Sequence, residues 1–213
     1  MKIIDLTHTL TDDIPVYPGD RPPRLTPLAT IEEHGFRQLG IETGSHTGTH
    51  VDAPAHLLPG GITLDMYPLE AFIGPALVLD CRLNEEQMRL ALRIQSARRA
   101  QFVLFRTGHG ALWGRPEYSS SWPTPPESIL RLLISRGVKG VGVDTLSVDP
   151  AGDAELPNHR LLMNAGLLIF ENLARLDLLP MGIFTFVGTP LRLPRADGAP
   201  VRALGIAKEL WDD

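Results

Sequence analysis

The alternation of apolar and polar positions along the chain predicts short strands interspersed with helices. Seven short runs are rich in β-branched, aliphatic or aromatic residues and are bounded by turn-forming residues, a pattern typical of strands. The predicted strands are Lys2–Leu6, Gln38–Thr43, Ala76–Leu79, Phe102–Arg106, Val138–Val143, Leu167–Phe170 and Ile183–Val187. Several of them alternate with helical segments in the second half of the chain, which favours an α/β fold.

Two helices are predicted from the residues at their ends. The first begins at a cap on Asn84, which Gln87 completes as a capping box, and runs to about Ala100. The second begins at a cap on Thr124, is followed by a proline suited to the first helical position, and ends at Gly137.

Residues 1–75 differ in character from the rest of the chain. They contain a group of prolines and then several glycines, which predicts extended segments and long loops packed on the α/β part. The prolines are Pro15, Pro18, Pro22, Pro23 and Pro27. We expect the functional site in this loop-rich N-terminal part.

Length and composition are those of one globular domain. The chain has 213 residues, 43% hydrophobic and 21% charged, so residues 1–213 can bury a core as a single domain. No segment has the apolar length of a membrane helix, and the amino end meets polar residues early, so we expect a cytoplasmic protein without a membrane partner. A net charge of −5 without a dense Lys/Arg run disfavours nucleic acid as a partner.

Four residues able to bind metal or carry protons fall within one short segment, residues 46–56. They are His46, His50, Asp52 and His56. Gly48 and Thr49 weaken a helix here and Pro54 would break one, whereas the even spacings suit a strand, so we expect residues 46–56 to be extended with all four side chains on one face. Cys81 is the only cysteine, which excludes a cysteine-based zinc cluster and leaves His, Asp and Glu as ligands.

A metal site is the interpretation that this segment favours. Two imidazoles and a carboxylate suit Zn²⁺ or Mn²⁺, and three protein ligands leave positions open for water and substrate. The alternative is a chance group of histidines in a polar loop. For the isolated His8, His34 and His109 we expect surface or hydrogen-bonding roles rather than metal ligation.

The chemistry of such a site follows from general principles. A divalent ion lowers the pKa of bound water to roughly 7 and stabilises negative charge on a carbonyl oxygen. When an amide is hydrolysed, the departing nitrogen must receive a proton, and we expect His56 to transfer it as general acid/base. Residues 106–108 follow a predicted strand and either line the pocket or form a capping turn.

Residues 46–56 resemble the His-x-Gly-Thr-His-x-Asp-x-Pro-x-His signature of the cyclase family, which includes bacterial kynurenine formamidases and isatin hydrolases. Further likenesses cover most of the chain, at Asp5–His8, Val16–Asp20, Gly142–Asp149 and Pro200–Ala203. The resemblance implies a swivelling β/β/α barrel-like fold, assembly as a homodimer or homotetramer, and hydrolysis of a linear or cyclic amide bond.

The resemblance also implies roles for individual residues. His46, His50 and Asp52 match the ligands of a first metal ion, and His56 matches the general acid/base. His159 and Glu171 stand where the ligands of a second ion are expected, although a polar residue at a helix start and a carboxylate at a strand end are the simpler alternatives. One ion and two ions both remain open.

The substrate is the least determined part of the prediction. Tyr17 stands where the formamidases carry a Trp, and we expect it to contact the substrate. An aryl formamide such as N-formylkynurenine, a cyclic amide or imide, and a cyclase or dehydratase reaction are all compatible, and a metal-binding module without turnover is the alternative from another class. Trp113, Tyr118 and Trp122 are candidates for a second pocket wall, although packing of a surface loop accounts for them equally well.

Overall fold

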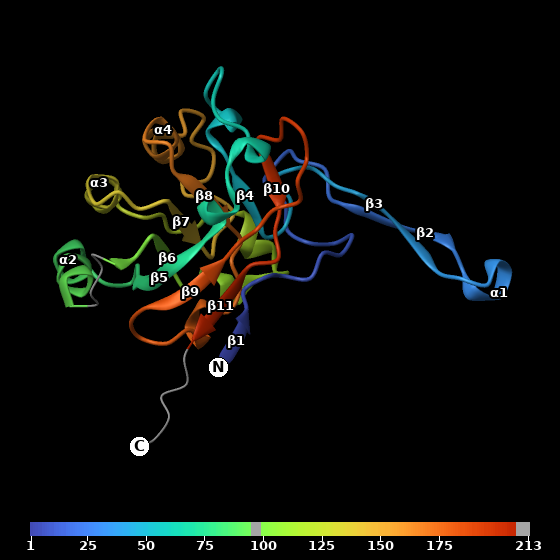
Figure 1. Cartoon of the computed structure of the whole chain (residues 1–213), viewed down its shortest axis with the longest axis horizontal. Coiled ribbons are helices and arrows are strands. Elements are labelled where there is room, and N and C mark those ends of the chain that lie inside the picture. The colour runs from blue at the N-terminus through green and yellow to red at the C-terminus, as the bar shows by residue number, and fades with distance from the viewer. Residues whose placement is uncertain (95–98, 208–213) are drawn as a thin grey trace.

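The computed structural model describes residues 1–94 and 99–207, and within them nine strands form one curled sheet (Figure 1). In spatial order the strands are β1 (Lys2–Asp5), β11 (Leu204–Ala207), β9 (Phe184–Val187), β5 (Ile73–Asp80), β6 (Phe102–Arg106), β7 (Gly140–Val143), β8 (Leu168–Glu171), β4 (His50–Asp52) and β10 (Gly198–Pro200). Strands β5 to β8 are parallel, and those on either side are antiparallel. The sheet forms a half-barrel, which confirms the predicted α/β class.

Three helices lie along one face of the parallel strands: α2 (Glu85–Ile94), α3 (Glu127–Ser135) and α4 (Pro157–Asn164) (Figure 1). Strand residues alternate between two buried clusters, as the pleat requires. Leu77, Val103 and Val141 pack on the helix side, whereas Ala76 and Leu104 pack inside the curl of the sheet. Parallel strands buried on both faces have the continuous apolar sequence seen here. Among the described helices, none is long and apolar enough to cross a membrane.

The predicted helix ends are correct in part. Asn84 and Gln87 form the predicted capping box, each backbone N–H donating to the other side chain. The predicted continuation of α2 to Ala100 crosses residues 95–98, which lie outside the described residues. Helix α3 begins after Pro126 rather than at Thr124, because a residue that precedes proline is disfavoured in helical conformation. Gly137 follows the end of α3 with φ 70°, as a C-terminal stop does.

All seven predicted strands are present, with small shifts at the ends of most, and β4 lies within the segment 46–56 that was also expected to be extended. Three observed strands, β2 (Arg24–Ala29), β10 and β11, were not predicted. Strand β10 has only three residues, so no apolar run marks it. Strand β11 has four residues, as many as β1 and β8, and was missed. Strand β2 contains Pro27, which weakens a strand prediction, and the pairing of β2 with β3 (Gln38–Glu42) shifts register next to that proline.

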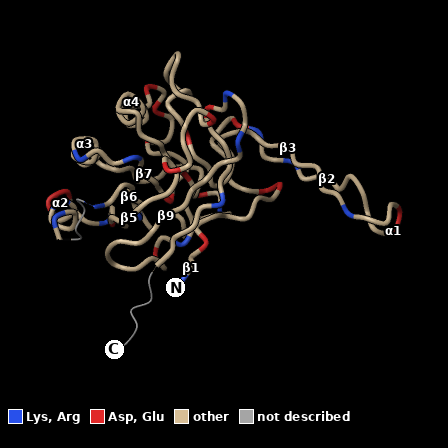
Figure 2. Tube along the Cα trace, viewed as in Figure 1, with Lys and Arg blue, Asp and Glu red and all other residues tan. Residues whose placement is uncertain are grey.

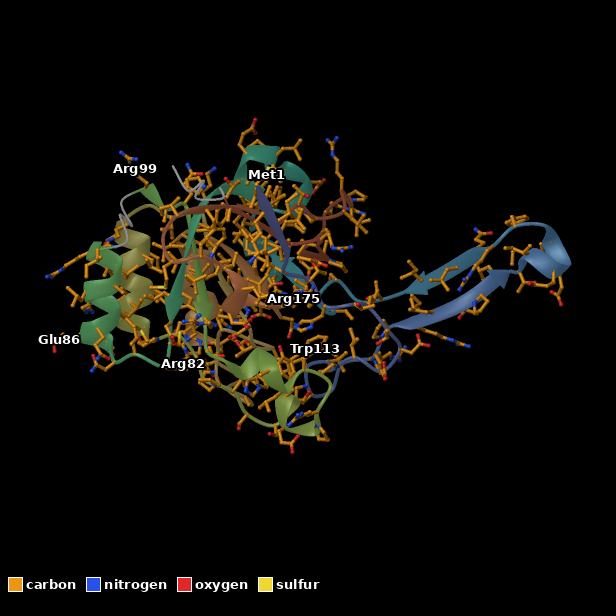
Figure 3. All side chains as sticks on the ribbon, turned by 90° about the horizontal axis from the view of Figure 1, so that it is seen from below. Met1, Arg82, Glu86, Arg99, Trp113 and Arg175 are labelled. Carbon is orange, nitrogen blue, oxygen red and sulfur yellow. The ribbon has the colours of Figure 1, made fainter. Side chains whose placement is uncertain are left out.

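Strands β2 and β3, with the short helix α1 (Ile31–His34) at their tip, form an arm that projects from the body (Figure 1). Several large apolar side chains of the arm are exposed: Leu28, Ile31, Phe36, Leu39 and Ile41. Figure 2 shows charged residues at the tip and base of the arm, with a largely uncharged length between them. In Figure 3 the side chains of the arm stand apart from those of the body. The arm therefore exposes apolar surface that the body does not cover.

Candidate metal centre and active site

Strand pairing brings the first two candidate ligands next to a third. His50 and Asp52 share one face of β4 because they are two residues apart. In the antiparallel pairing of β4 with β8, His50 lies opposite Glu171. Val51 and Phe170, the next cross-strand pair, point instead into the core inside the curled sheet. This register places the side chains of His50, Asp52 and Glu171 on the face of the sheet that the helices cover.

The expectation that residues 46–56 form one extended ligand strand is wrong. Only His50–Asp52 is a strand, because Gly48 adopts φ 64°, a left-handed conformation that interrupts an extended chain. His56 lies in a 3-10 turn that begins at Pro54. His46 returns over the strand nonetheless, and its ring centroid is 4.0 Å from that of His56. A bend and a turn, rather than the pleat of a strand, bring these two imidazoles together.

Asp52 lies at the centre of the candidate ligands and contacts three imidazoles. Its Oδ1 is 2.6 Å from His46 Nδ1 and 3.2 Å from His50 Nε2, and its Oδ2 is 3.5 Å from His159 Nε2. Glu171 lies 3.4 Å from both His50 Nε2 and His159 Nε2. The described residues form three groups of possible ligands, and Asp52 belongs to two of them, one with His46 and His50 and one with His159 and Glu171. The third group is His46, His56 and Asp197. The position of Asp52 in two groups suits a carboxylate that bridges two ions.

The second nitrogen of each candidate ligand imidazole contacts a fixed oxygen. The pairs are His46 Nε2 with Asp197 Oδ2 at 2.8 Å, His50 Nδ1 with the Gly48 carbonyl at 2.8 Å, and His159 Nδ1 with Asp149 Oδ2 at 2.7 Å. Metal-binding histidines almost always donate their other N–H to such an acceptor, which fixes the tautomer and the ring orientation. The remaining three nitrogens all face Asp52.

The unsatisfied atoms of the site fit a divalent cation. His50 Nε2 and Asp52 Oδ2 are buried and have no hydrogen-bond partner. Buried polar atoms without a partner are rare in proteins, and a cation in contact with both would satisfy them. Imidazole nitrogens with carboxylate oxygens are donors that Zn²⁺ and Mn²⁺ accept. The chemistry of the site therefore supports a metal cofactor.

The electrostatics of the metal-free site show how strongly it favours positive charge. Burial alone lowers the pKa of His50 and of His159, but neighbouring carboxylates outweigh burial. Asp52 and Glu171 raise the pKa of His50 well above its usual range. Hydrogen bonds to Asp149 and Asp52 raise the pKa of His159 to about 10. Burial also opposes ionisation of Asp52, yet His50 holds the pKa of Asp52 well below its usual range. The carboxylates thus favour positive charge between them, whether a proton or a cation carries it.

The site opens into a cavity of about 510 Å³, a volume typical of small-molecule pockets. His56 lines this cavity, and burial lowers its pKa below the usual range. Apolar residues of the lining include Leu146 and Leu156, and two carboxylates, Asp20 and Asp153, are also part of it. The cavity can therefore hold a small organic substrate beside the ligand groups and His56.

Tyr17 lines the cavity, as expected of a residue that contacts substrate. Its ring packs edge-on against Trp122, with centroids 5.9 Å apart. The suggestion that Trp113, Tyr118 and Trp122 form a second wall is not supported, because none of them is among the described residues that line the cavity. Tyr118 and Trp122 are buried behind the site. Trp122 Nε1 donates to the Asp149 carbonyl, so this cluster supports the site rather than the substrate.

The isolated histidines lie outside the cavity, as expected. His8 stacks on Trp113 with centroids 3.7 Å apart, and buried His109 donates from Nε2 to the Tyr118 carbonyl, 3.0 Å away. His34 is exposed and accepts from the Thr30 N–H. Residues 106–108 do not line the cavity but form a turn, the second of their two expected roles. The backbone N–H groups of residues 107 and 108 donate to the buried Asp144 carboxylate.

Two functional carboxylates were not identified from the sequence. Asp149 accepts from the backbone N–H groups of Asn158 and His159 at the start of α4, and it also orients the His159 ring. Asp197 orients His46 from a loop far away in sequence. Asp149 lies in one of the segments that carry the family resemblance, but nothing in its spacing links it to His159. No sequence signal points to Asp197.

Comparisons with known proteins agree with this geometry. A family model described as a putative cyclase matches residues 4–150. A kynurenine formamidase of Salinibacter ruber is 35% identical over 207 residues, covering 96% of this chain and 97% of that protein. The structure of isatin hydrolase A from Labrenzia aggregata superposes with a TM-score of 0.84 at 30% identity, covering 98% of this chain and 94% of that chain. A predicted metal-dependent hydrolase from Bacillus stearothermophilus has a TM-score of 0.77 at 30% identity, with 97% and 98% covered.

The fold and the buried ligand groups, together with these likenesses, define a metal-dependent hydrolase. The family model covers more than half of the chain, and the relatives match nearly all of it. The chain belongs to the cyclase family.

Metal binding should release protons, because the metal-free site holds protons on imidazoles that must be neutral to bind metal. The pKa of His159 is raised from 6.5 to about 10, so at pH 7 this imidazole is charged and must lose a proton on ligation. We expect the affinity for Zn²⁺ to rise about tenfold per pH unit per proton released between pH 7 and 9. Calorimetry in buffers of different ionisation enthalpy measures the number of protons.

The stability of the metal-free protein should fall as pH rises, whereas the affinity for Zn²⁺ should rise. The interactions of charged His159 are fully present below pH 6.5 and are lost as pH rises toward 10, so this group stabilises the metal-free protein less at high pH.

For the proton release on Zn²⁺ binding, the exposed His34→Ala variant is the control and should release the same number of protons as the wild-type protein. Zn²⁺ binding with no proton release at pH 7 would contradict the assignment.

Proposed function

We propose that this protein is a metal-dependent amide hydrolase whose substrate is an aryl formamide such as N-formylkynurenine. The observation that carries the proposal is the position of Asp52, shared by two ligand groups at a cavity that His56 also lines. The relative from Salinibacter ruber, which bears the name kynurenine formamidase, supports the formamide. His46, His50 and Asp52 would hold one Zn²⁺ ion, and Asp52, His159 and Glu171 a second. Mn²⁺ is the alternative metal.

A bound divalent cation supplies Lewis-acid stabilisation of the carbonyl oxygen and lowers the pKa of water to about 7. Hydrolysis adds a water oxygen to the formyl carbon and breaks its bond to nitrogen, releasing formate and an aniline. His56 is the group that transfers a proton to the departing nitrogen. Its Nδ1 lies 3.5 Å from Asp197 Oδ2, so Nε2 is the nitrogen left to exchange a proton with substrate.

A cyclic amide is the second candidate substrate, and the likeness to isatin hydrolase A supports it. Opening a cyclic amide breaks the same carbon–nitrogen bond and needs the same proton on nitrogen, so the roles of the residues do not change. The two substrates differ in shape: the formamide is open and flexible, whereas the cyclic amide is flat and rigid. Contacts along the wall that carries Tyr17 therefore distinguish them.

His56 should be needed for formamide hydrolysis but not for metal binding. In the Zn²⁺-loaded protein, His56→Ala should lower kcat for N-formylkynurenine about 10²- to 10⁴-fold, the usual contribution of a general acid/base. Elemental analysis should find the metal content unchanged, whereas His50→Ala should lose both metal and activity. His34→Ala is the matched control on an exposed histidine. A metal-loaded wild-type protein inactive on both N-formylkynurenine and isatin would refute the proposed function.

The Tyr17 side chain should reveal which kind of substrate the cavity takes. For an aryl formamide, Tyr17→Trp should maintain or improve turnover, and Tyr17→Ala should raise KM through the loss of a ring contact of about 0.5–1.5 kcal/mol. For a cyclic substrate the larger indole should obstruct the cavity and lower kcat/KM. Steady-state kinetics on both substrates compares the three proteins. Equal activity of all three on N-formylkynurenine would show that Tyr17 does not touch substrate.

We propose that the protein assembles as a homodimer or homotetramer and acts in the cytoplasm on a small-molecule substrate. The arm supports assembly, because monomers rarely leave a row of large apolar side chains exposed on a projecting hairpin. A second copy of the chain would cover this surface. The single cysteine, Cys81, and the net charge of −5 support a cytoplasmic enzyme with no role in nucleic-acid binding.

Charge placed on the arm should dissociate the assembly. Leu39 and Ile41 are exposed on β3. The double variant Leu39→Lys, Ile41→Asp should reduce the mass measured by light scattering from that of a dimer or tetramer to that of a monomer. Glu33→Lys at the tip of the arm is the control and should keep the wild-type mass. A wild-type protein that is monomeric at micromolar concentration would contradict the proposed assembly.

A further inference from the structure

One carboxylate oxygen of the loop before β10 contacts both a candidate metal ligand and the candidate proton carrier. Asp197 Oδ2 lies 2.8 Å from His46 Nε2 and 3.5 Å from His56 Nδ1. We propose that Asp197 is a positioning residue that fixes both imidazoles at once, so that metal binding and proton transfer depend on the same side chain. The inference rests on the proposed function for the roles of His46 and His56.

The backbone of Asp197 is held by the strand that carries the ligands. Its carbonyl accepts from the Ala53 N–H at 2.8 Å, directly after β4. The next residue, Gly198, pairs with Asp52 across β10 and β4. The position of the Asp197 carboxylate is therefore tied to the same strand pair as Asp52. The Asp197 side chain can rotate, but its backbone is tied to the strand that carries His50 and Asp52.

The His46 ring also packs closely against the backbone of Gly198, which restricts its position. A Cβ at Gly198 would lie 2.5 Å from His46 Cε1 and 2.9 Å from Nδ1, closer than side-chain atoms approach. Only glycine leaves room for the imidazole against this backbone. The ring is thus bounded by Asp52 at Nδ1, by Asp197 at Nε2 and by the Gly198 backbone.

His46 needs such a support more than the other two candidate ligands. The acceptors for His50 and His159 are a backbone carbonyl and the fully buried Asp149, so packing already fixes them. The His46 side chain is 21% exposed and that of Asp197 is 43% exposed. The orientation of His46 therefore depends on a hydrogen bond that water can compete for.

A shared acceptor also determines the tautomer of both rings. A carboxylate oxygen only accepts, so Asp197 keeps a proton on His46 Nε2, and Nδ1, which faces Asp52, is the nitrogen that would lose its proton to bind a cation. For the same reason His56 carries its proton on Nδ1 and leaves Nε2 for substrate. Asp197 is not among the described residues that line the cavity, so it acts on substrate only through these two imidazoles.

The test uses Asp197→Ala, Asp197→Asn, Gly198→Ala and a control, Asp177→Asn, on an exposed residue outside the cavity lining. Zn²⁺ affinity is measured by chelator competition, and Co²⁺ absorption bands report ligand geometry. Asp197→Ala should lower affinity about 10- to 100-fold, the usual effect of removing a partner of a metal-binding His, and should alter the Co²⁺ bands. Asp197→Asn keeps an acceptor oxygen and should recover part of the affinity. Gly198→Ala should reproduce the loss by displacing His46.

Proton-nitrogen NMR of the Zn²⁺-loaded protein tests the His56 half without any substrate. Wild-type protein should show His56 protonated on Nδ1, and Asp197→Ala should show a mixture of tautomers. With saturating Zn²⁺, Asp197→Ala should lower kcat about tenfold at unchanged KM in the wild-type background. The fall should be smaller in the His56→Ala background, because the part of the effect that acts through His56 is absent there.

Several results would overturn the inference. Unchanged Zn²⁺ affinity and Co²⁺ bands in Asp197→Ala would show that His46 needs no such support. An equal fall of kcat with and without His56 would show that Asp197 does not act through it. Loss of a whole equivalent of metal per chain would make Asp197 a ligand instead. If the wild-type protein hydrolyses neither amide, the proposed function fails, but affinity, Co²⁺ bands and tautomers still decide the role of Asp197.

Discussion

The Asp52 carboxylate is 1% exposed, and its burial is the constraint on which the rest of the site depends. An isolated charge removed from water to this extent is strongly destabilising unless opposite charge or hydrogen bonds compensate. In this protein three imidazoles surround the carboxylate, and Glu171 adds a second buried negative charge nearby. These carboxylates raise the pKa values of His50 and His159, and the same negative charge would favour a bound cation.

The curled sheet satisfies this constraint by placing β4 between β8 and β10. Each neighbour delivers a residue beside Asp52: β8 carries Glu171, and β10 begins directly after Asp197. Helix α4 then brings His159 over the same face, and Asp149 holds both the start of that helix and the ring of its histidine. The parallel strands and their helices thus form a rigid support, while the chemistry lies at the antiparallel margin of the sheet.

The surroundings of the site change from fully buried to partly exposed. His50, His159 and Glu171 are almost fully buried. Packing fixes the acceptors of the two imidazoles, and Glu171 accepts from the Val148 N–H, so their positions cost little further ordering when a ligand binds. His46, His56 and Asp197 are partly exposed. The proposed proton carrier, His56, is thus on the more exposed side of Asp52, whereas the candidate ligands range from buried His50 and His159 to partly exposed His46.

The sequence by itself determined the α/β class, the parallel core strands and the chemical nature of the site. Apolar runs such as Phe102–Arg106 are long enough to mark strands, and His50 and Asp52 are close enough in sequence for their shared face to follow from the pleat. It did not determine the path of the segment around them, because a single left-handed glycine, Gly48, turns an expected strand into a bend. Tertiary structure alone decided the partners of the ligands. Asp197 and His56 are 141 positions apart, and only the pairing of two three-residue strands, too short to leave an apolar pattern, brings them together.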